Sequence, residues 1–262
     1  MRRTLLIATT AAVLLIGAAS AYAAINTYTT KFSFTSSKPG TVKKPVPTGF
    51  TYTITAGGTN GNRSALLTHI TTKAYGLKAN LKALPTCSLA SIAAAKNDTG
   101  CPKAALVATG YIHAVVGSPT DFKAAAAPCN PGIDVWNSGG GKLTFFFVDG
   151  AVHNCDALGL KTGSTGPFPS TEKQQGKNLV VDTPIPEFVT SPLGLAGSLQ
   201  LEYLKWNKST TVKGKKVNIL TSVGCQKGKR PYSATLTANL PTTPTTTTAT
   251  ETKTVSGSAA CK

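Results

Sequence analysis

The sequence contains few charged residues and very few acidic ones. Charged residues make up 14% of its 262 residues, with only ten Asp or Glu and three His. There is no C-x-x-C pair, no His at ligand spacing from a Cys, and no G-x-S-x-G elbow, so neither a structural zinc site nor a nucleophile elbow is expected. We therefore expect no metal and no cofactor, and we assign no catalytic residue.

After its first residues, the chain also lacks any apolar run long enough to cross a membrane as a helix. The first residues form a targeting signal: Arg2 and Arg3 precede an apolar stretch at residues 5–19, and Ala21-Tyr22-Ala23 matches an A-x-A cleavage pattern. We predict a signal peptide at residues 1–23 and a secreted protein, extracellular or in the cell envelope. An uncleaved anchor is the alternative, but the apolar stretch is short and small residues crowd the cleavage site.

Helical periodicity is nearly absent, and short runs of alternating polar and apolar residues take its place. These patterns predict an all-β fold, an antiparallel β-sandwich of jelly-roll or Ig-like type, over residues 24–262. A division near residue 165 is the alternative to a single domain. The expected strands are residues 27–35, 49–56, 66–74, 106–116, 142–148, 151–160, 178–181, 198–206, 217–223, 232–240 and 250–256. Residues 117–141 and 161–176 are rich in Gly and Pro, so we expect exposed loops there.

One short helix is expected at residues 89–95. Ser88 is a suitable N-cap, Asn97 and Gly100 favour the end of the helix, and Pro102 prevents its continuation. Cys87 stands immediately before this segment and Cys101 immediately after it. A disulfide between them would make the segment a stapled structural corner, and we assign it no chemistry.

All six cysteines follow the signal peptide, and an even number in an exported chain predicts three disulfides. Six cysteines allow 15 pairings. We favour nearest neighbours in sequence: Cys87–Cys101, Cys129–Cys155 and Cys225–Cys261. The last pair would lock a closing hairpin made of residues 232–240 and 250–256.

The chain is strongly basic, with a net charge of +17, or +15 without Arg2 and Arg3. Such a charge favours anionic partners outside the cell, such as a cell-wall polymer or an acidic polysaccharide. The segment from residue 203 to residue 250 contains no Asp or Glu. Its candidate binding residues are Lys213, Lys215, Lys216, Lys227, Lys229 and Arg230. Solvated turns are the alternative explanation, and no motif indicates a specific nucleic-acid partner.

Aromatic and acidic residues supply two further hypotheses. Trp136 lies in an expected loop and is a candidate platform for a glycan. A polysaccharide hydrolase would need two carboxyl groups across a sugar-binding cleft. Asp149 is better explained as a turn residue, and Glu202 as part of the polar face of a strand.

Residues 80–262 resemble a loose group of uncharacterised exported β-rich proteins of high-GC Gram-positive bacteria. The similar elements are Leu84-Pro85-Thr86-Cys87-Ser88, then Cys101-Pro102 and a Gly-containing strand at residues 107–111, and later Cys225 and Cys261. At residues 108–110, where such proteins carry Gly, this chain has Ala108-Thr109-Gly110. The resemblance implies the 87–101 and 225–261 pairings and a β-rich fold, and it brings no activity.

The sequence therefore predicts a secreted, non-enzymatic envelope or extracellular protein that binds an anionic or glycan surface. The alternatives are a secreted hydrolase that acts on polysaccharide and a structural component with no ligand.

Overall fold

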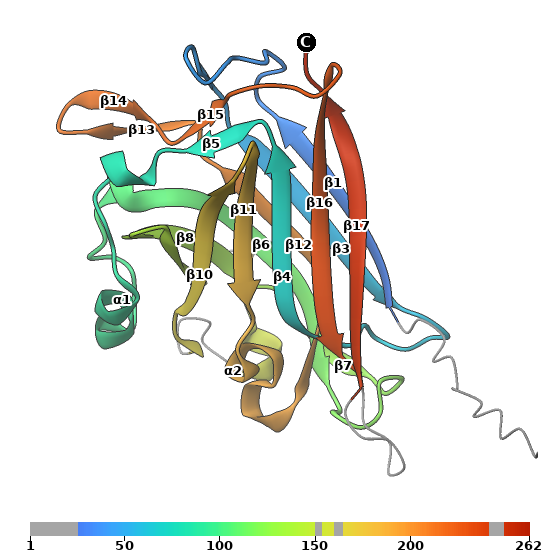
Figure 1. The fold of residues 1–262 in the computed structure, drawn as a ribbon. Helices are drawn as coiled ribbons and strands as arrows, with labels where there is room; N and C mark the ends of the chain where they lie inside the picture. Colours follow the sequence, from blue (N-terminus) through green and yellow to red (C-terminus); the bar gives the residue numbers. More distant parts are fainter. Residues whose placement is uncertain (1–25, 150–153, 160–164, 241–248) are drawn as a thin grey trace, which may run out of the picture.

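The structure is a computed structural model and describes residues 26–149, 154–159, 165–240 and 249–262 (Figure 1). The predicted signal peptide lies outside these residues. The strands are β1 (Asn26–Phe34), β2 (Val46–Pro47), β3 (Phe50–Gly58), β4 (Leu66–Tyr75), β5 (Leu77–Ala79), β6 (Leu106–Gly117), β7 (Ala126–Cys129), β8 (Gly132–Gly139), β9 (Lys142–Val148), β10 (Phe168–Gln175), β11 (Asn178–Pro184), β12 (Ala196–Trp206), β13 (Ser209–Val212), β14 (Lys215–Asn218), β15 (Leu220–Ser222), β16 (Lys229–Asn239) and β17 (Thr250–Ala260). The α-helices are α1 (Leu89–Ala95) and α2 (Glu187–Thr190). None of the helices in the described ranges has the length and apolar character that a membrane crossing requires.

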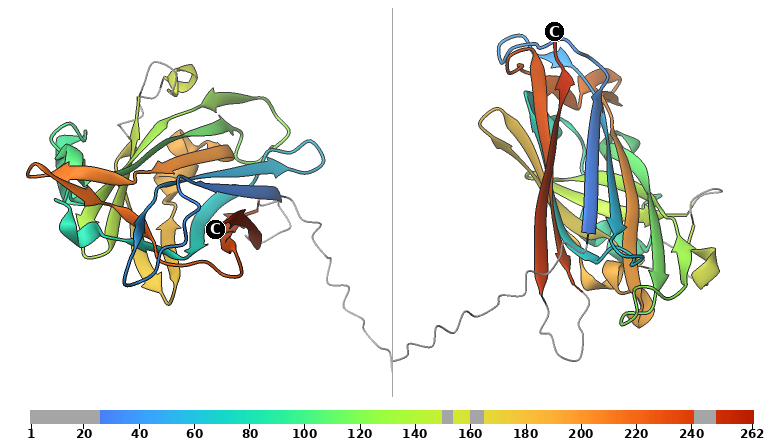
Figure 2. Two further views of the ribbon diagram at one scale, coloured as in Figure 1. Left: turned by 90° about the horizontal axis from the view of Figure 1, so that it is seen from above. Right: turned by 90° about the vertical axis from the view of Figure 1, so that its right-hand side faces the viewer.

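In the described part of the chain, one 12-stranded sheet carries the fold. Its order is β1-β3-β12-β6-β8-β9-β10-β11-β4-β16-β17, with β7 paired to β6, and its neighbours are antiparallel. The predicted all-β antiparallel class is therefore confirmed. The arrangement differs from a sandwich, because the sheet twists and coils until β1 and β17 lie side by side in a nearly closed, barrel-like sheet (Figure 2). Strands from both sides of residue 165 belong to it.

Side chains rather than a hydrogen-bonded ladder connect β1 to β17. The Asn26 side-chain amide donates a hydrogen bond to Glu251 at 2.6 Å. The rings of Phe32 on β1 and Tyr232 on β16 stack with centroids 4.5 Å apart. Gly257 on β17 makes this stack possible, because an added Cβ would lie 2.7 Å from Cε2 of Tyr232. A charge-assisted hydrogen bond therefore joins the two edge strands directly, and an aromatic stack joins β1 to β16 across Gly257 of β17.

The alternation of each strand places its apolar side chains inside the barrel-like sheet. On β3, for example, Phe50, Tyr52, Ile54 and Ala56 are buried and the threonines between them are not fully buried. One end of the interior is filled: the small sheet β2-β15-β5 lies across it, with Leu220 among its buried side chains. The opposite end, where α2 lies, contains the cavity described below (Figure 1).

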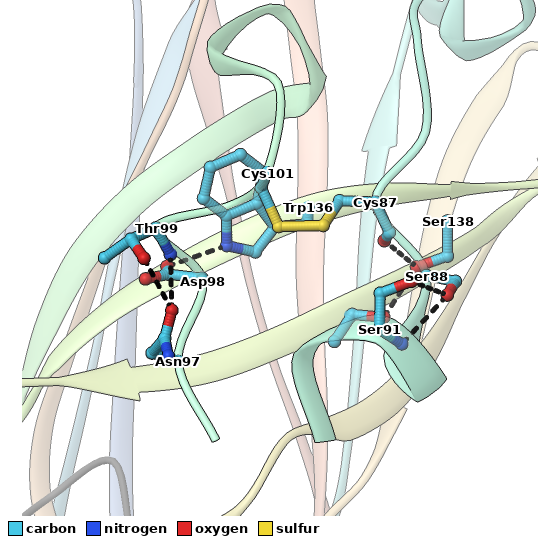
Figure 3. The surroundings of a disulfide bond; sticks show 10 residues. Cys87, Ser88, Ser91, Asn97, Asp98, Thr99, Cys101, Trp136 and Ser138 are labelled. Carbon is cyan, nitrogen blue, oxygen red and sulfur yellow. Dashed lines mark hydrogen bonds between the residues drawn. A yellow bond between two sulfur atoms is a disulfide. The ribbon is translucent and has the colours of Figure 1, made fainter. Parts of the chain in front are cut away.

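The stapled corner forms as the sequence predicts (Figure 3). The Ser88 hydroxyl caps α1 by accepting a hydrogen bond from the Ser91 amide at 3.1 Å, and the helix ends at Ala95. Beneath the corner, Ile92 packs with Trp136 and Phe146 in a small core outside the main one. The corner therefore covers the outer faces of β8 and β9.

All three predicted disulfides are confirmed. Cys87 pairs with Cys101, Cys129 with Cys155, and Cys225 with Cys261. The closing hairpin is confirmed as well, since β16 and β17 pair from Lys229↔Ala260 to Asn239↔Thr250. The last disulfide lies at the end of this hairpin where β16 begins.

Two of the predicted loops are wrong. Residues 117–141 contain β7 and β8, and residues 161–176 contain β10. Glycines and prolines at the ends of these segments conceal short strands whose inward residues are apolar, such as Ile133 and Val135 on β8. The strand predicted at residues 151–160 is also wrong where it is described, because Asp156–Leu158 form a 3-10 turn and Cys155 makes only a single β-bridge.

Candidate functional site

A cavity of about 110 Å³ lies inside the barrel-like sheet at the end where α2 is found. Its wall is almost entirely apolar and comes from strands that are distant in sequence. The side chains that shape it include Ile112 and Ala114 of β6, Ile133 of β8, and Phe145 and Phe147 of β9. Such a concave, mostly apolar space with few polar groups is the usual form of a small-molecule site.

The cavity exists because small residues occupy positions in its wall where larger side chains would fill it. Ala114 points inward between Ile112 and Val116, and Gly197 of β12 lines the same space. At the outer end, the rim is formed by the Cys129–Cys155 disulfide and by Ile185, Val189, Thr190 and Pro192. The segment that includes α2 also exposes two large apolar side chains, Phe188 at 44% and Leu193 at 74%.

One carboxyl group lines this apolar space. Glu202 of β12 stands opposite Ile54 of β3 and Ile112 of β6, and only 5% of it is exposed. The Tyr52 hydroxyl donates a hydrogen bond to its Oε1 at 2.7 Å. Oε2 is buried and has no hydrogen-bond partner among the residues that the structure describes. An unpaired oxygen in such surroundings is costly, so the position invites a polar group from a ligand.

Burial dominates the protonation behaviour of this pair. Loss of hydration raises the pKa of Glu202 to about 7, against the smaller opposing effect of the hydrogen bond from Tyr52. Burial and the adjacent Glu202 raise the pKa of Tyr52 well above its ordinary value. Tyr52 is therefore a permanent donor near neutral pH, while Glu202 is divided between its protonated and ionised forms.

The sequence pattern misplaced Glu202. It lies on the inward face of β12 together with Leu204 and Trp206, not on a polar outer face. Strict alternation put Glu202, Leu204 and Trp206 on one face, and the two apolar partners were the signal that this face is buried. Tyr52 shares the buried face of β3 with Phe50 and Ile54, which offered no sign of its polar partner.

Two of the predicted binding residues are structural. Trp136 lies in β8 rather than in a loop and is only 5% exposed. Its indole N–H donates to Asp98 Oδ2 at 3.0 Å (Figure 3). Trp136 thus anchors the stapled corner and presents no face to a glycan. The expectation failed because the Gly and Pro residues around β8 suggested a loop.

Arg230 is the second predicted binding residue with a structural role, since it is fully buried in β16. Its guanidinium lies over the Phe34 ring at 4.4 Å and donates to the Ser222 hydroxyl at 2.5 Å. Burial lowers its pKa. Arg230 therefore packs the filled end of the sheet and is not part of a basic surface. Its place in a Lys/Gly-rich turn had hidden this.

The predicted lysines are exposed but fall into two groups. Lys213, Lys215 and Lys216 lie at and beside the turn of the β13–β14 hairpin, which projects from the body of the protein (Figure 1). Lys227 and Lys229 lie at the start of β16, where the C-terminal disulfide is found. The hairpin is thus the place where predicted basic residues gather on one exposed element.

Two further acidic residues, Asp98 and Asp134, lie under the stapled corner. Burial, together with the charge of Asp98 and a hydrogen bond with it, raises the pKa of Asp134 to about 7. Neither residue lines the cavity. Within the described ranges, no group of three or more His, Cys, Asp or Glu side chains could hold a metal ion.

Comparison with protein-family models and with curated proteins gave no match. The geometry of the chain itself is therefore the basis for a function. Two features of the chain point to binding: the apolar cavity with Glu202, and the lysine-bearing β13–β14 hairpin.

Proposed function

We propose that this chain is a secreted, non-enzymatic protein that binds a small apolar molecule inside its barrel-like sheet. The observation that carries the proposal is the cavity of about 110 Å³, whose apolar wall is interrupted by the buried carboxyl of Glu202. Burying apolar ligand surface there would provide about 25 cal/mol per Å². The predicted signal peptide and the three disulfides support an extracellular or envelope location.

The size of the cavity limits the ligand. Its volume of about 110 Å³ is of the same order as the roughly 150 Å³ apolar cavity that takes up benzene, so it holds a molecule of only a few heavy atoms. The rim between the Cys129–Cys155 disulfide and Pro192 belongs to the same space, so a longer ligand could extend toward it. Short aliphatic molecules are therefore suitable probes.

The geometry favours a binding protein over the polysaccharide hydrolase. A glycosidase places two carboxyl groups on either side of a scissile bond, about 5 Å or more apart. Asp98 and Asp134 are instead hydrogen-bonded to each other, and the indole N–H of Trp136 donates to Asp98. Glu202 has Tyr52, not a second carboxyl group, as its partner.

Filling the cavity should weaken binding. Ala114→Leu adds bulk to the cavity wall, and we expect it to weaken binding of butan-1-ol by at least about tenfold, since two excluded methylene groups are worth roughly 1.6 kcal/mol. The measurement is a titration followed by NMR chemical shifts of the lining residues. The melting temperature should stay the same or rise, because the added side chain occupies existing space.

The matched control is His113→Leu, which changes the exposed neighbour on the same strand. It should bind butan-1-ol as the wild type does. Equal binding by Ala114→Leu and the wild type would mean that the probe sits elsewhere, and would refute the cavity as the site.

A second candidate function rests on the β13–β14 hairpin, which presents Lys213, Lys215 and Lys216 to solvent. The hairpin would bind an anionic cell-wall polymer through charge. We expect the triple Lys→Gln variant to bind purified teichoic acid at least about tenfold more weakly at low salt, and to show a smaller loss of affinity as salt rises. Binding is measured by calorimetry at several ionic strengths.

The control removes the same charge from dispersed exposed lysines on the main sheet: Lys31, Lys73 and Lys205. If both triple variants lose the same affinity, net charge alone drives binding and the hairpin is no site.

A further inference from the structure

The position of Glu202 indicates which ligands the cavity accepts. Its carboxyl is more than nine-tenths buried and lines the cavity, with one oxygen held and the other unpaired. Two of the hydroxyls that line the cavity are engaged elsewhere: Thr183 shares a hydrogen bond with Ser170, and Thr190 donates to the Glu187 carbonyl. Oε2 of Glu202, in contrast, is an unpaired polar atom of a residue in this wall.

The partner of Glu202 makes it an acceptor. Tyr52 can only donate to Oε1 near neutral pH, because its own pKa is raised well above the ordinary value. A donated hydrogen bond favours the ionised carboxylate, whose two oxygens accept hydrogen bonds and donate none. In the ionised form, the group that completes the site is therefore one that donates to Oε2.

We infer that the ligand is an aliphatic molecule with one hydrogen-bond donor, an O–H or N–H, that binds Oε2 of Glu202 while its chain fills the apolar cavity. The inference rests on the proposed function, since it names the ligand class of the same site. Neutral alcohols and cationic amines share this chemistry. Ketones and ethers, which only accept, lack it.

The affinity for donor ligands should depend on pH. A donor stabilises the ionised form, so donor ligands bind more tightly as pH rises through about 7, the pKa of Glu202. An acceptor needs the protonated form and shows the opposite trend. On the elements packed around it, the titratable residue that faces Glu202 is Tyr52. Tyr111 and His113 of β6, and Tyr203 and Lys205 of β12, lie on the outer face, and Glu187 of α2 is exposed.

The test compares four probes of similar length on the full chain: butan-1-ol, butan-1-amine, butan-2-one and 1-chlorobutane. Affinities are measured by NMR titration at pH 5.5 and pH 8.5. We expect at least one donor probe to bind about tenfold or more tighter than 1-chlorobutane at pH 8.5. Butan-1-amine, which as a cation can only donate, should lose most of that advantage at pH 5.5, whereas butan-1-ol can also accept a hydrogen bond from the protonated carboxyl and should lose less. A lead for the alcohol or for the amine supports the inference equally and shows whether the head group is neutral or cationic.

Two variants test whether the carboxyl group of Glu202, and not the cavity around it, causes the pH dependence. Glu202→Gln keeps an acceptor for Tyr52 but cannot ionise, so the pH dependence of donor binding should disappear while binding of 1-chlorobutane persists. Glu187→Gln, at an exposed position of α2, should behave as the wild type does. The pH dependence of the wild type tests the inference even where the Gln variant folds poorly.

The outcomes are distinguishable. If 1-chlorobutane binds in the cavity but donors gain nothing over it at pH 8.5, or butan-2-one binds at pH 8.5 as tightly as the better donor, the inference is overturned and the proposed function stands. If none of the four probes shifts the lining residues, both are overturned.

Discussion

Raising the pH from 4.5 to 8 should favour the Glu202→Gln variant over the wild type by about 3 kcal/mol in the free energy of unfolding. The folded pKa of Glu202, about 7, lies above its ordinary value of 4.5. The protonated carboxyl therefore stabilises the wild type fully below about pH 4.5, and this contribution is lost as pH rises to about 7. At 1.36 kcal/mol for each pH unit, the loss amounts to about 3 kcal/mol, and Gln at this position has no such dependence.

Urea unfolding of both proteins at the two pH values measures this difference. Asp134 also has a raised pKa, so its ionisation lowers the free energy of unfolding as pH rises. Because Asp134 is present in both proteins, this effect cancels in the difference between them. Glu187→Gln, with its exposed side chain, serves as the control and should follow the wild type. Parallel stability profiles for Glu202→Gln and the wild type would show that Glu202 is not a buried carboxyl of raised pKa.

Removal of the C-terminal disulfide is expected to cost about 4 kcal/mol. Cys225 and Cys261 are 36 residues apart in sequence, and the chain-entropy relation assigns about 4 kcal/mol to a loop of that length. Their bridge also holds the end of β17 beside the start of β16. At its other end, β17 contacts β1 through the hydrogen bond from Asn26 to Glu251. The double Cys→Ala variant should therefore lose stability and loosen the junction of β17 with β1.

Urea unfolding gives the stability, and hydrogen exchange of the β17 amides reports on the junction. The control is the double Cys87/Cys101→Ala variant, whose cysteines are 14 residues apart, with an expected cost of about 3 kcal/mol. Its β17 amides should keep their relative protection, because the corner packs on β8 and β9. Unchanged exchange in β17 after loss of Cys225–Cys261 would contradict the role assigned to that bridge.

Local patterns in the sequence predict a large part of this fold. The strand predicted at residues 142–148 from a run that is apolar on both faces matches β9 (Lys142–Val148), and Ser88 caps α1 (Leu89–Ala95) as its side-chain chemistry requires. Nearest-neighbour pairing of the cysteines succeeds because each pair closes a local corner or hairpin. The sequence fails where Gly and Pro surround a short buried strand, as for Trp136 in β8.

The closure of the sheet and the site itself depend on contacts between distant residues. A sandwich and a closed sheet use the same period-two alternation, so the meeting of Phe32 and Tyr232 is not encoded in any local pattern. The pairing of Tyr52 with Glu202 spans 150 residues. Each residue alone fits an ordinary strand, and only their proximity makes a buried acceptor in an apolar cavity.

The measurement that tests the central claim most directly is intermolecular NOE spectroscopy with butan-1-ol at pH 8.5. Binding inside the barrel-like sheet predicts NOEs from the methylene protons of the alcohol to the methyl groups of Ile112 and Ile133, two residues of the cavity wall. These NOEs should vanish in the Ala114→Leu variant. Saturable binding without NOEs to either isoleucine, or NOEs confined to exposed residues, would contradict the claim that the cavity is a ligand site.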